Sequence, residues 1–118
     1  MRVGHFAAAV FAAAFVSGEA EAQTRRFDGY WTVQAVTERG TCDRVFNWPV
    51  IISYGRVRYG GAEPVAISGG IAGNGAVSGA LAYGQVRANM RGRLSGYAGG
   101  GSWIAGVCAG RWYARRTG

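Results

Sequence analysis

Few side chains of this chain could carry out covalent or acid–base chemistry. His5 is the only histidine among the 118 residues, and there is no lysine. Because His5 lies in a segment with the pattern of a cleaved signal peptide, the remaining chain has no Ser–His or Cys–His pair for nucleophilic catalysis. Without lysine there is also no Schiff-base residue and no phosphate-binding loop of the usual kind. These absences favour a protein that binds over one that catalyses.

Two carboxylates near the first predicted turn are the remaining candidates for catalysis. A pair of carboxylates can hydrolyse glycosidic bonds, and Glu38 and Asp43 are close in the sequence. Each stands beside an arginine, Arg39 or Arg44, and exposed carboxylates next to arginines are more often surface ion pairs. We therefore predict no catalytic residue and no enzyme activity.

The two cysteines, Cys42 and Cys108, predict a disulfide. The alternatives are a metal site or two free thiols. Structural zinc takes four ligands, so two cysteines without histidine make a poor metal site. In an oxidising compartment, the two cysteines of a small domain usually pair. A Cys42–Cys108 bond would close a loop of about 66 residues and contribute roughly 4 kcal/mol in the chain-entropy model. We expect no metal and no cofactor.

Residues 1–22 have the layout of a secretory signal peptide. An arginine precedes an apolar run over residues 6–16, and Ala20-Glu21-Ala22 follows, so cleavage is expected after Ala22. The run of 11 residues is roughly half of the ~20 that a membrane-spanning helix needs, and no later segment is apolar enough. We predict a periplasmic or secreted protein whose residues 23–118 form a single β-barrel domain, with no transmembrane segment after cleavage.

Apolar and polar residues alternate with a period of two through most of residues 23–118, and glycines separate the alternating segments. This pattern is typical of half-buried antiparallel strands. Eight strands are expected, over residues 28–37, 44–53, 56–59, 65–71, 76–82, 85–94, 100–107 and 110–116.

Two local signals refine these strands. Asn74-Gly75 lies between alternating apolar segments, which predicts a type I′ hairpin turn, because that turn needs positive φ angles. Pro49 lies inside the second expected strand and cannot donate a ladder hydrogen bond. We therefore expect a β-bulge or an unpaired position at Pro49.

Strand order indicates how the sheet ends. In a simple up-and-down arrangement of eight strands, the first and last strands are antiparallel and can pair, which removes unpaired edges. Cys42 follows the first expected strand and Cys108 precedes the last one, so both would lie at one end of the barrel beside the closing seam. We predict an all-β protein, a small eight-stranded antiparallel up-and-down barrel whose seam is fastened by the disulfide.

Two resemblances accompany this prediction. Gly29-x-Trp31 and Arg116 resemble the calycin pattern of lipocalins and avidins, in which an arginine near the C-terminus covers the tryptophan. This resemblance implies a calycin-like meander in which Arg116 stacks on Trp31. The chain is also similar to small exported alphaproteobacterial β-barrel proteins of unknown function. That similarity is carried by Phe27-Asp28-Gly29-x-Trp31, Cys42-Asp43-Arg44 and Cys108-x-Gly110-Arg111-Trp112.

The barrel interior has two interpretations. Tryptophans on inward positions could line a pocket for a small apolar ligand; they are Trp31, Trp48, Trp103 and Trp112. Alternatively, the same side chains fill the interior, since eight strands enclose little more than their own side chains, and we favour this filled core. Small inward residues either leave room for a ligand or let the sheet coil tightly; they are Gly69, Gly79, Ala88 and Gly92.

The exterior is strongly basic. Residues 23–118 contain twelve arginines and four acidic residues, a net charge of +8, which favours anionic partners. One outward set is expected to form a basic face across neighbouring strands: Arg56, Arg58, Arg87, Arg91 and Arg93. The expected partners are anionic envelope lipid or polysaccharide, since an exported protein seldom meets nucleic acid. The alternative is a solvated exterior that only keeps the domain soluble.

Together these observations predict an exported, non-catalytic β-barrel that binds to, or supports, the cell envelope through an unknown ligand. One alternative is a carrier of a small apolar ligand inside the barrel. Another follows from a resemblance of small exported eight-stranded barrels with one disulfide to periplasmic metalloprotease inhibitors, in which an N-terminal segment blocks the protease. In that case residues 23–26 would be the flexible blocking tail.

Overall fold

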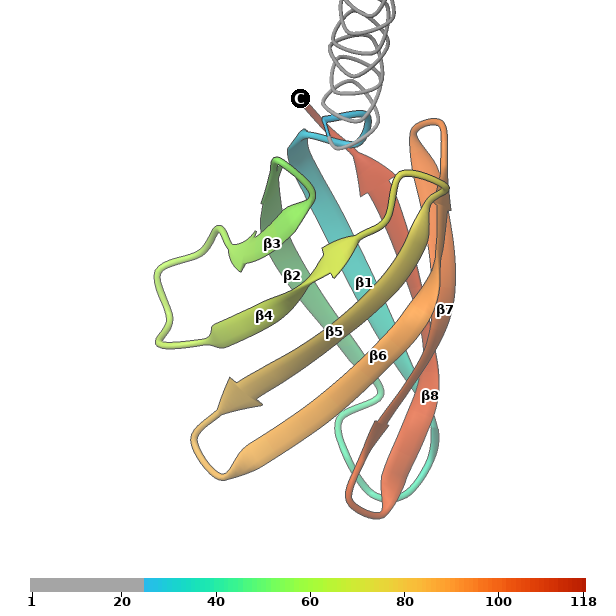
Figure 1. The fold of residues 1–118 in the computed structure, drawn as a ribbon. Coiled ribbons are helices and arrows are strands. Elements are labelled where there is room, and N and C mark those ends of the chain that lie inside the picture. Colours follow the sequence, from blue (N-terminus) through green and yellow to red (C-terminus); the bar gives the residue numbers. More distant parts are fainter. Residues whose placement is uncertain (1–24) are drawn as a thin grey trace, which may run out of the picture.

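The computed structural model describes residues 25–118, which form eight antiparallel strands. The strands are β1 (Gly29–Arg39), β2 (Val45–Ser53), β3 (Arg56–Tyr59), β4 (Ala66–Ile71), β5 (Ala76–Tyr83), β6 (Val86–Ser95), β7 (Ala98–Ala105) and β8 (Cys108–Arg116). Each strand pairs with the next, and β8 pairs with β1, so the sheet closes into a barrel (Figure 1). The predicted up-and-down barrel is therefore confirmed. The predicted signal peptide lies outside the described residues.

The predicted strands differ from the observed ones most clearly around the last hairpin. The strand expected over residues 100–107 is Ala98–Ala105, and β8 begins at Cys108 instead of residue 110. The turn between them is Gly106-Val107, where Gly106 has a φ of +60° and Val107 is 85% exposed. A two-residue hairpin turn suits a glycine at its first position. This turn ends the strand although the apolar alternation continues through Val107.

The core consists of the inward-facing side chains of the barrel. Its buried apolar residues are Phe27, Trp31, Val33, Ala35, Val50, Ile52, Ile71, Leu81, Leu94, Trp103, Cys108, Trp112 and Ala114. No polar or charged side chain is buried among residues 25–118. The period-two alternation therefore places the apolar core on the inner face of the sheet, although some outward positions are also apolar, such as Val45 on β2 and Ile104 on β7.

The type I′ turn predicted at Asn74-Gly75 is wrong, although the hairpin between β4 and β5 forms. Gly75 has a φ of +93°, but Asn74 is not among the residues with positive φ. The turn hydrogen bond runs from the Gly75 N–H to the Ala72 carbonyl, at 2.8 Å. Gly75 thus follows the turn instead of lying at its centre, as in hairpins with a three-residue loop.

Two consecutive positive φ angles occur instead between β2 and β3, at Tyr54 (52°) and Gly55 (74°). A left-handed conformation is costly for tyrosine, and local contacts offset that cost. The Asp28 carboxylate accepts hydrogen bonds from the backbone N–H groups of Tyr54 and Gly55, at 2.9 and 3.3 Å. The Arg25 guanidinium lies 5.3 Å from the Tyr54 ring centre. The segment before β1 therefore holds this turn in place.

Pro49 is unpaired only on the side of β3, and β2 has no bulge there. The register between β1 and β2 runs without interruption through the pair Thr32 and Pro49. The Pro49 carbonyl accepts a hydrogen bond from the Gly60 N–H at 2.8 Å, just beyond the end of β3. The β2–β3 ladder ends at Val50, the residue next to Pro49. Because Pro49 lies outside this ladder, its missing N–H removes no hydrogen bond from it.

The seam between β1 and β8 closes the barrel. Its register runs from the pair Trp31 and Arg116 to the pair Arg39 and Ala109, with an irregularity close to the Arg39 end. The first and last strands of the domain therefore lie edge to edge over almost their whole length.

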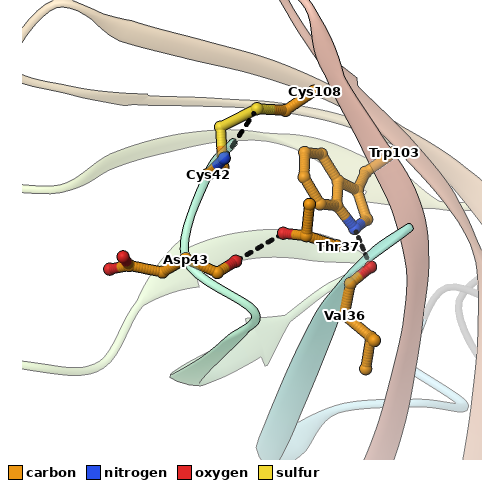
Figure 2. The surroundings of a disulfide bond; sticks show 6 residues. All are labelled: Val36, Thr37, Cys42, Asp43, Trp103 and Cys108. Atoms are coloured by element: carbon orange, nitrogen blue, oxygen red, sulfur yellow. Dashed lines mark hydrogen bonds between the residues drawn. A yellow bond between two sulfur atoms is a disulfide. The ribbon is translucent and has the colours of Figure 1, made fainter. Parts of the chain in front are cut away.

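The Cys42–Cys108 disulfide confirms the predicted pairing and lies at one end of this seam (Figure 2). It joins the loop after β1 to the first residue of β8, with an S–S distance of 2.02 Å. The same loop is held by a hydrogen bond from the Thr37 hydroxyl to the Asp43 carbonyl, at 2.5 Å. The disulfide and this hydrogen bond together attach the first loop to the two strands that close the barrel.

Candidate binding sites

One end of the barrel is closed by Trp31 and the residues around it. Trp31 is 1% exposed, and its indole N–H donates a hydrogen bond to the Phe27 carbonyl at 2.9 Å. The Arg116 guanidinium lies 5.9 Å from the Trp31 ring centre and 5.7 Å from the Tyr97 ring centre. It also donates a hydrogen bond to the Asp28 carbonyl. Arg116 thus lies over Trp31 and joins the start of β1 to the end of β8.

An apolar cavity of about 70 Å³ lies inside the barrel. Three tryptophans line it, Trp31, Trp48 and Trp112, together with aliphatic side chains of β1 to β6 and β8. Engineered cavities of ~150 Å³ bind benzene, and pockets for drug-sized ligands start near ~300 Å³. The tryptophans therefore fill most of the interior and leave space only for a small apolar group.

Trp103 does not line this cavity, so that part of the predicted pocket is wrong. Its indole N–H points to the seam and lies 3.2 Å from both the Val36 and Arg111 carbonyls. In Figure 2 the indole lies beside the disulfide loop. A buried indole needs an acceptor for its N–H, and the seam supplies two, which holds the ring away from the central cavity.

The small inward residues mainly allow close packing. A Cβ atom on Gly92 would lie 2.6 Å from the Trp112 ring and 2.2 Å from the Gly100 carbonyl oxygen. One on Gly69 would lie 2.4 Å from the Ser78 carbonyl oxygen, and the φ of Gly69 is +133°. Only Gly79 of this set lines the cavity. These contacts favour the filled core over the open pocket.

Trp48 also belongs to a half-exposed aromatic cluster. Its ring stacks on Phe46 at a centroid distance of 6.1 Å and meets Tyr59 and Tyr83 edge-on, at 5.8 and 6.4 Å. The Tyr59 hydroxyl donates a 2.5 Å hydrogen bond to the Glu63 carboxylate. This bond raises the pKa of Tyr59 to about 12 and lowers the pKa of Glu63. Near neutral pH the Tyr59 hydroxyl therefore stays protonated and the Glu63 carboxylate stays ionised, which preserves the hydrogen bond between them.

The predicted basic face is divided in two. Arg56 and Arg58 project outward from β3, whereas Arg87, Arg91 and Arg93 project from β6. These strands are not neighbours, because β4 and β5 lie between them. At about 4.8 Å per strand, the two groups are roughly 14 Å apart. The prediction of one face over neighbouring strands is therefore wrong.

Two arginines outside the predicted basic face lie closer to the β6 group. Arg111 and Arg115 are exposed on β8, and only β7 separates them from β6. In the ladders, Arg91 is paired with Ser102, and Ser102 is paired with Arg111. The outward parity of the predicted eighth strand already contained this signal, once strands six, seven and eight are placed side by side.

Neither a metal site nor a membrane-spanning helix is found in the described part of the chain. No group of three or more Cys, His, Asp or Glu residues within 25–118 could hold a metal ion. Over the same range, no helix has the length and apolar character needed to cross a membrane. No family model, curated protein or solved structure matches this chain.

Proposed function

We propose that this chain is an exported, non-catalytic binding protein of the cell envelope, whose basic exterior binds anionic envelope lipid or polysaccharide. The observation that carries the proposal is the placement of charge. Residues 25–118 hold twelve arginines against four acidic residues, and no charged side chain is buried among them. Almost all of this positive charge is therefore available to a partner in solution.

Two further observations support the proposed location. The disulfide is of the kind that persists in oxidising compartments such as the periplasm. Residues 1–22 carry the sequence pattern of a signal peptide. Both agree with an exported protein that meets the envelope from outside the cytoplasm.

Binding to anionic vesicles and to an acidic polysaccharide, each compared with a neutral counterpart, tests this function. At low ionic strength, purified protein should bind to phosphatidylglycerol vesicles, to polygalacturonate, or to both. Binding should weaken steeply as salt is added, because exposed charges are screened. Equal retention on neutral vesicles and dextran, or no binding to either anionic probe, would contradict the proposal.

The cavity favours a second candidate function, the binding of a small apolar group inside the barrel. Its lining atoms are apolar, and Trp31, Trp48 and Trp112 surround it. At about 70 Å³ it accepts only part of a ligand, such as the end of an alkyl chain. Short alkanes and alcohols should then shift the tryptophan fluorescence in a saturable manner, and a linear, non-saturating response would refute this function.

The protease-inhibitor alternative receives less support from the described part of its tail. The Arg25 guanidinium lies over the Tyr54 ring at 5.3 Å, and Arg26 donates a hydrogen bond to the Gly73 carbonyl at 3.1 Å. Both side chains thus contact the barrel, whereas a blocking tail would have to detach from the barrel to reach a protease. Inhibition of a co-encoded protease that is lost on removal of residues 23–26 would still restore this alternative.

A further inference from the structure

A groove of about 380 Å³ lies on the outer face of the barrel over β6, β7 and β8. Its lining includes three arginines from three strands: Arg39 at the end of β1, Arg91 on β6 and Arg111 on β8. We propose that this groove is the specific binding site for a carboxylate-bearing polysaccharide chain. The inference deepens the proposed function and rests on it, because it assigns the anionic partner to one site on the exterior.

Strand register explains why the surface is hollowed here. On the outer face of β7, Ser102 and the exposed side chain of Ile104 form the floor of the groove. Arg91 and Arg111 stand opposite Ser102 on either side, and Asn89 and Ala109 stand opposite Ile104. Facing walls are therefore two strand spacings apart, roughly 10 Å. That width suits a single extended chain lying along β7.

The walls present charge that the protein itself does not use. The side chains of Arg91 and Arg111 are exposed, and neither donates a hydrogen bond to another residue within 25–118. Glu38 is the one acidic residue among the groove-lining residues of the described chain, beside Arg39 at one end. Positive charges that line a hollow strengthen the field inside it. Guanidinium groups bind carboxylates through two parallel hydrogen bonds, so the groove suits carboxylates spaced along a chain.

Shape and aromatic content favour polysaccharide over the other anionic polymers. A bilayer surface is broad and contacts projecting side chains, so it would not reach the floor at Ser102, between Arg91 and Arg111. Sequence-tolerant nucleic-acid grooves stack successive bases on several aromatic rings, whereas Trp103, which is buried, is the one aromatic residue among the groove-lining residues of the described chain. The exposed side chain of Ile104 offers an apolar surface against which a sugar unit can pack.

The test compares two double variants with the same change in charge. The first variant, Arg91→Gln with Arg111→Gln, removes the two charges that face each other across the groove. The second, Arg56→Gln with Arg58→Gln, removes the same number of charges from β3, which β4 and β5 separate from β6. All four side chains are exposed, so both variants should fold, which circular dichroism checks. Binding is measured at one salt concentration against polygalacturonate, its methyl-esterified form, phosphatidylglycerol vesicles and oligothymidylate.

The groove predicts that the Arg91/Arg111 variant loses affinity for polygalacturonate by at least about tenfold, as expected when charge-assisted hydrogen bonds are removed. The Arg56/Arg58 variant should lose about threefold or less, from the lower net charge alone. Equal losses in the two variants would overturn the groove and leave the proposed function standing. Binding of the unaltered protein to vesicles or oligothymidylate but not to polygalacturonate would overturn the polysaccharide assignment. Binding to none of the anionic probes would overturn both proposals.

Discussion

Two adjacent arginines at the end of β8 have different roles because they face opposite sides of the sheet. Arg116 faces inward, over Trp31 and Tyr97, and donates a hydrogen bond to the Asp28 carbonyl. Arg115 faces outward and is exposed. The two residues contribute equally to the net charge, but the alternation of the strand gives only Arg116 a structural role.

At the residue scale we therefore predict that Arg116→Gln lowers the free energy of unfolding by about 1–2 kcal/mol, because it removes a cation–π contact and a hydrogen bond. Arg115→Gln, the matched control, should change it by less than about 0.5 kcal/mol. Urea denaturation followed by tryptophan fluorescence measures both. Equal effects of the two substitutions would show that charge, and not the stacking on Trp31, stabilises this end of the barrel.

At the scale of elements, the packing of β6 against β7 and β8 depends on the absence of a side chain at Gly92. A Cβ atom added to Gly92 would lie only 2.6 Å from the Trp112 ring and 2.2 Å from the Gly100 carbonyl oxygen. Gly79 on β5 differs, since a Cβ there would meet only the Ser68 carbonyl oxygen at 3.2 Å, next to the cavity.

Gly92→Ala is therefore expected to lower the free energy of unfolding by about 1–3 kcal/mol, because overpacking displaces backbone as well as the indole. Gly79→Ala should change it by less than about 1 kcal/mol, since its methyl group enters the cavity. Thermal or urea denaturation compares the two variants. If Gly79→Ala were the more harmful substitution, the assignment of the tryptophan-filled interior would be wrong.

The number and order of the strands could be predicted from the sequence because alternation and glycine are local signals. The hairpin at Asn74-Gly75 was likewise predictable, but its turn type was not, since the same dipeptide suits turns of two and three residues. Positive φ at Tyr54 depends on Asp28, which is distant in the sequence. Local patterns carry no information about such a contact.

The candidate sites were less predictable, because they depend on which strands are neighbours and on where each ring points. Parity placed Trp103 inside the barrel, yet hydrogen bonds to the seam hold it away from the cavity. Parity also placed Arg56 and Arg91 outside, but the sheet separates them by two strands. Parity and the meander order place Arg111 outside and near β6, and the register of β7 with β8 sets it opposite Ser102.

At the scale of the whole molecule, closure of the barrel depends on the β1–β8 ladder and on the disulfide at one of its ends. The ladder extends from Trp31 to Arg39 on β1, whereas the Cys42–Cys108 bond adds a single link over a sequence separation of 66 residues. A link of this length contributes about 4 kcal/mol by limiting the unfolded chain. Small domains have a total stability of about 5–15 kcal/mol, so the bond is a large fraction of it but does not by itself form the seam.

We accordingly predict that Cys42→Ser with Cys108→Ser gives a barrel that still folds but is less stable by up to about 4 kcal/mol. Its urea m-value should rise, because an unfolded chain without the link exposes more surface. Circular dichroism at zero denaturant should match that of the parent protein, since the β1–β8 hydrogen bonds do not involve the sulfur atoms. Loss of the sheet signal before any denaturant is added would show instead that the ladder cannot close without the bond. An unchanged unfolding midpoint would show that the unfolded chain is already compact around the two cysteines.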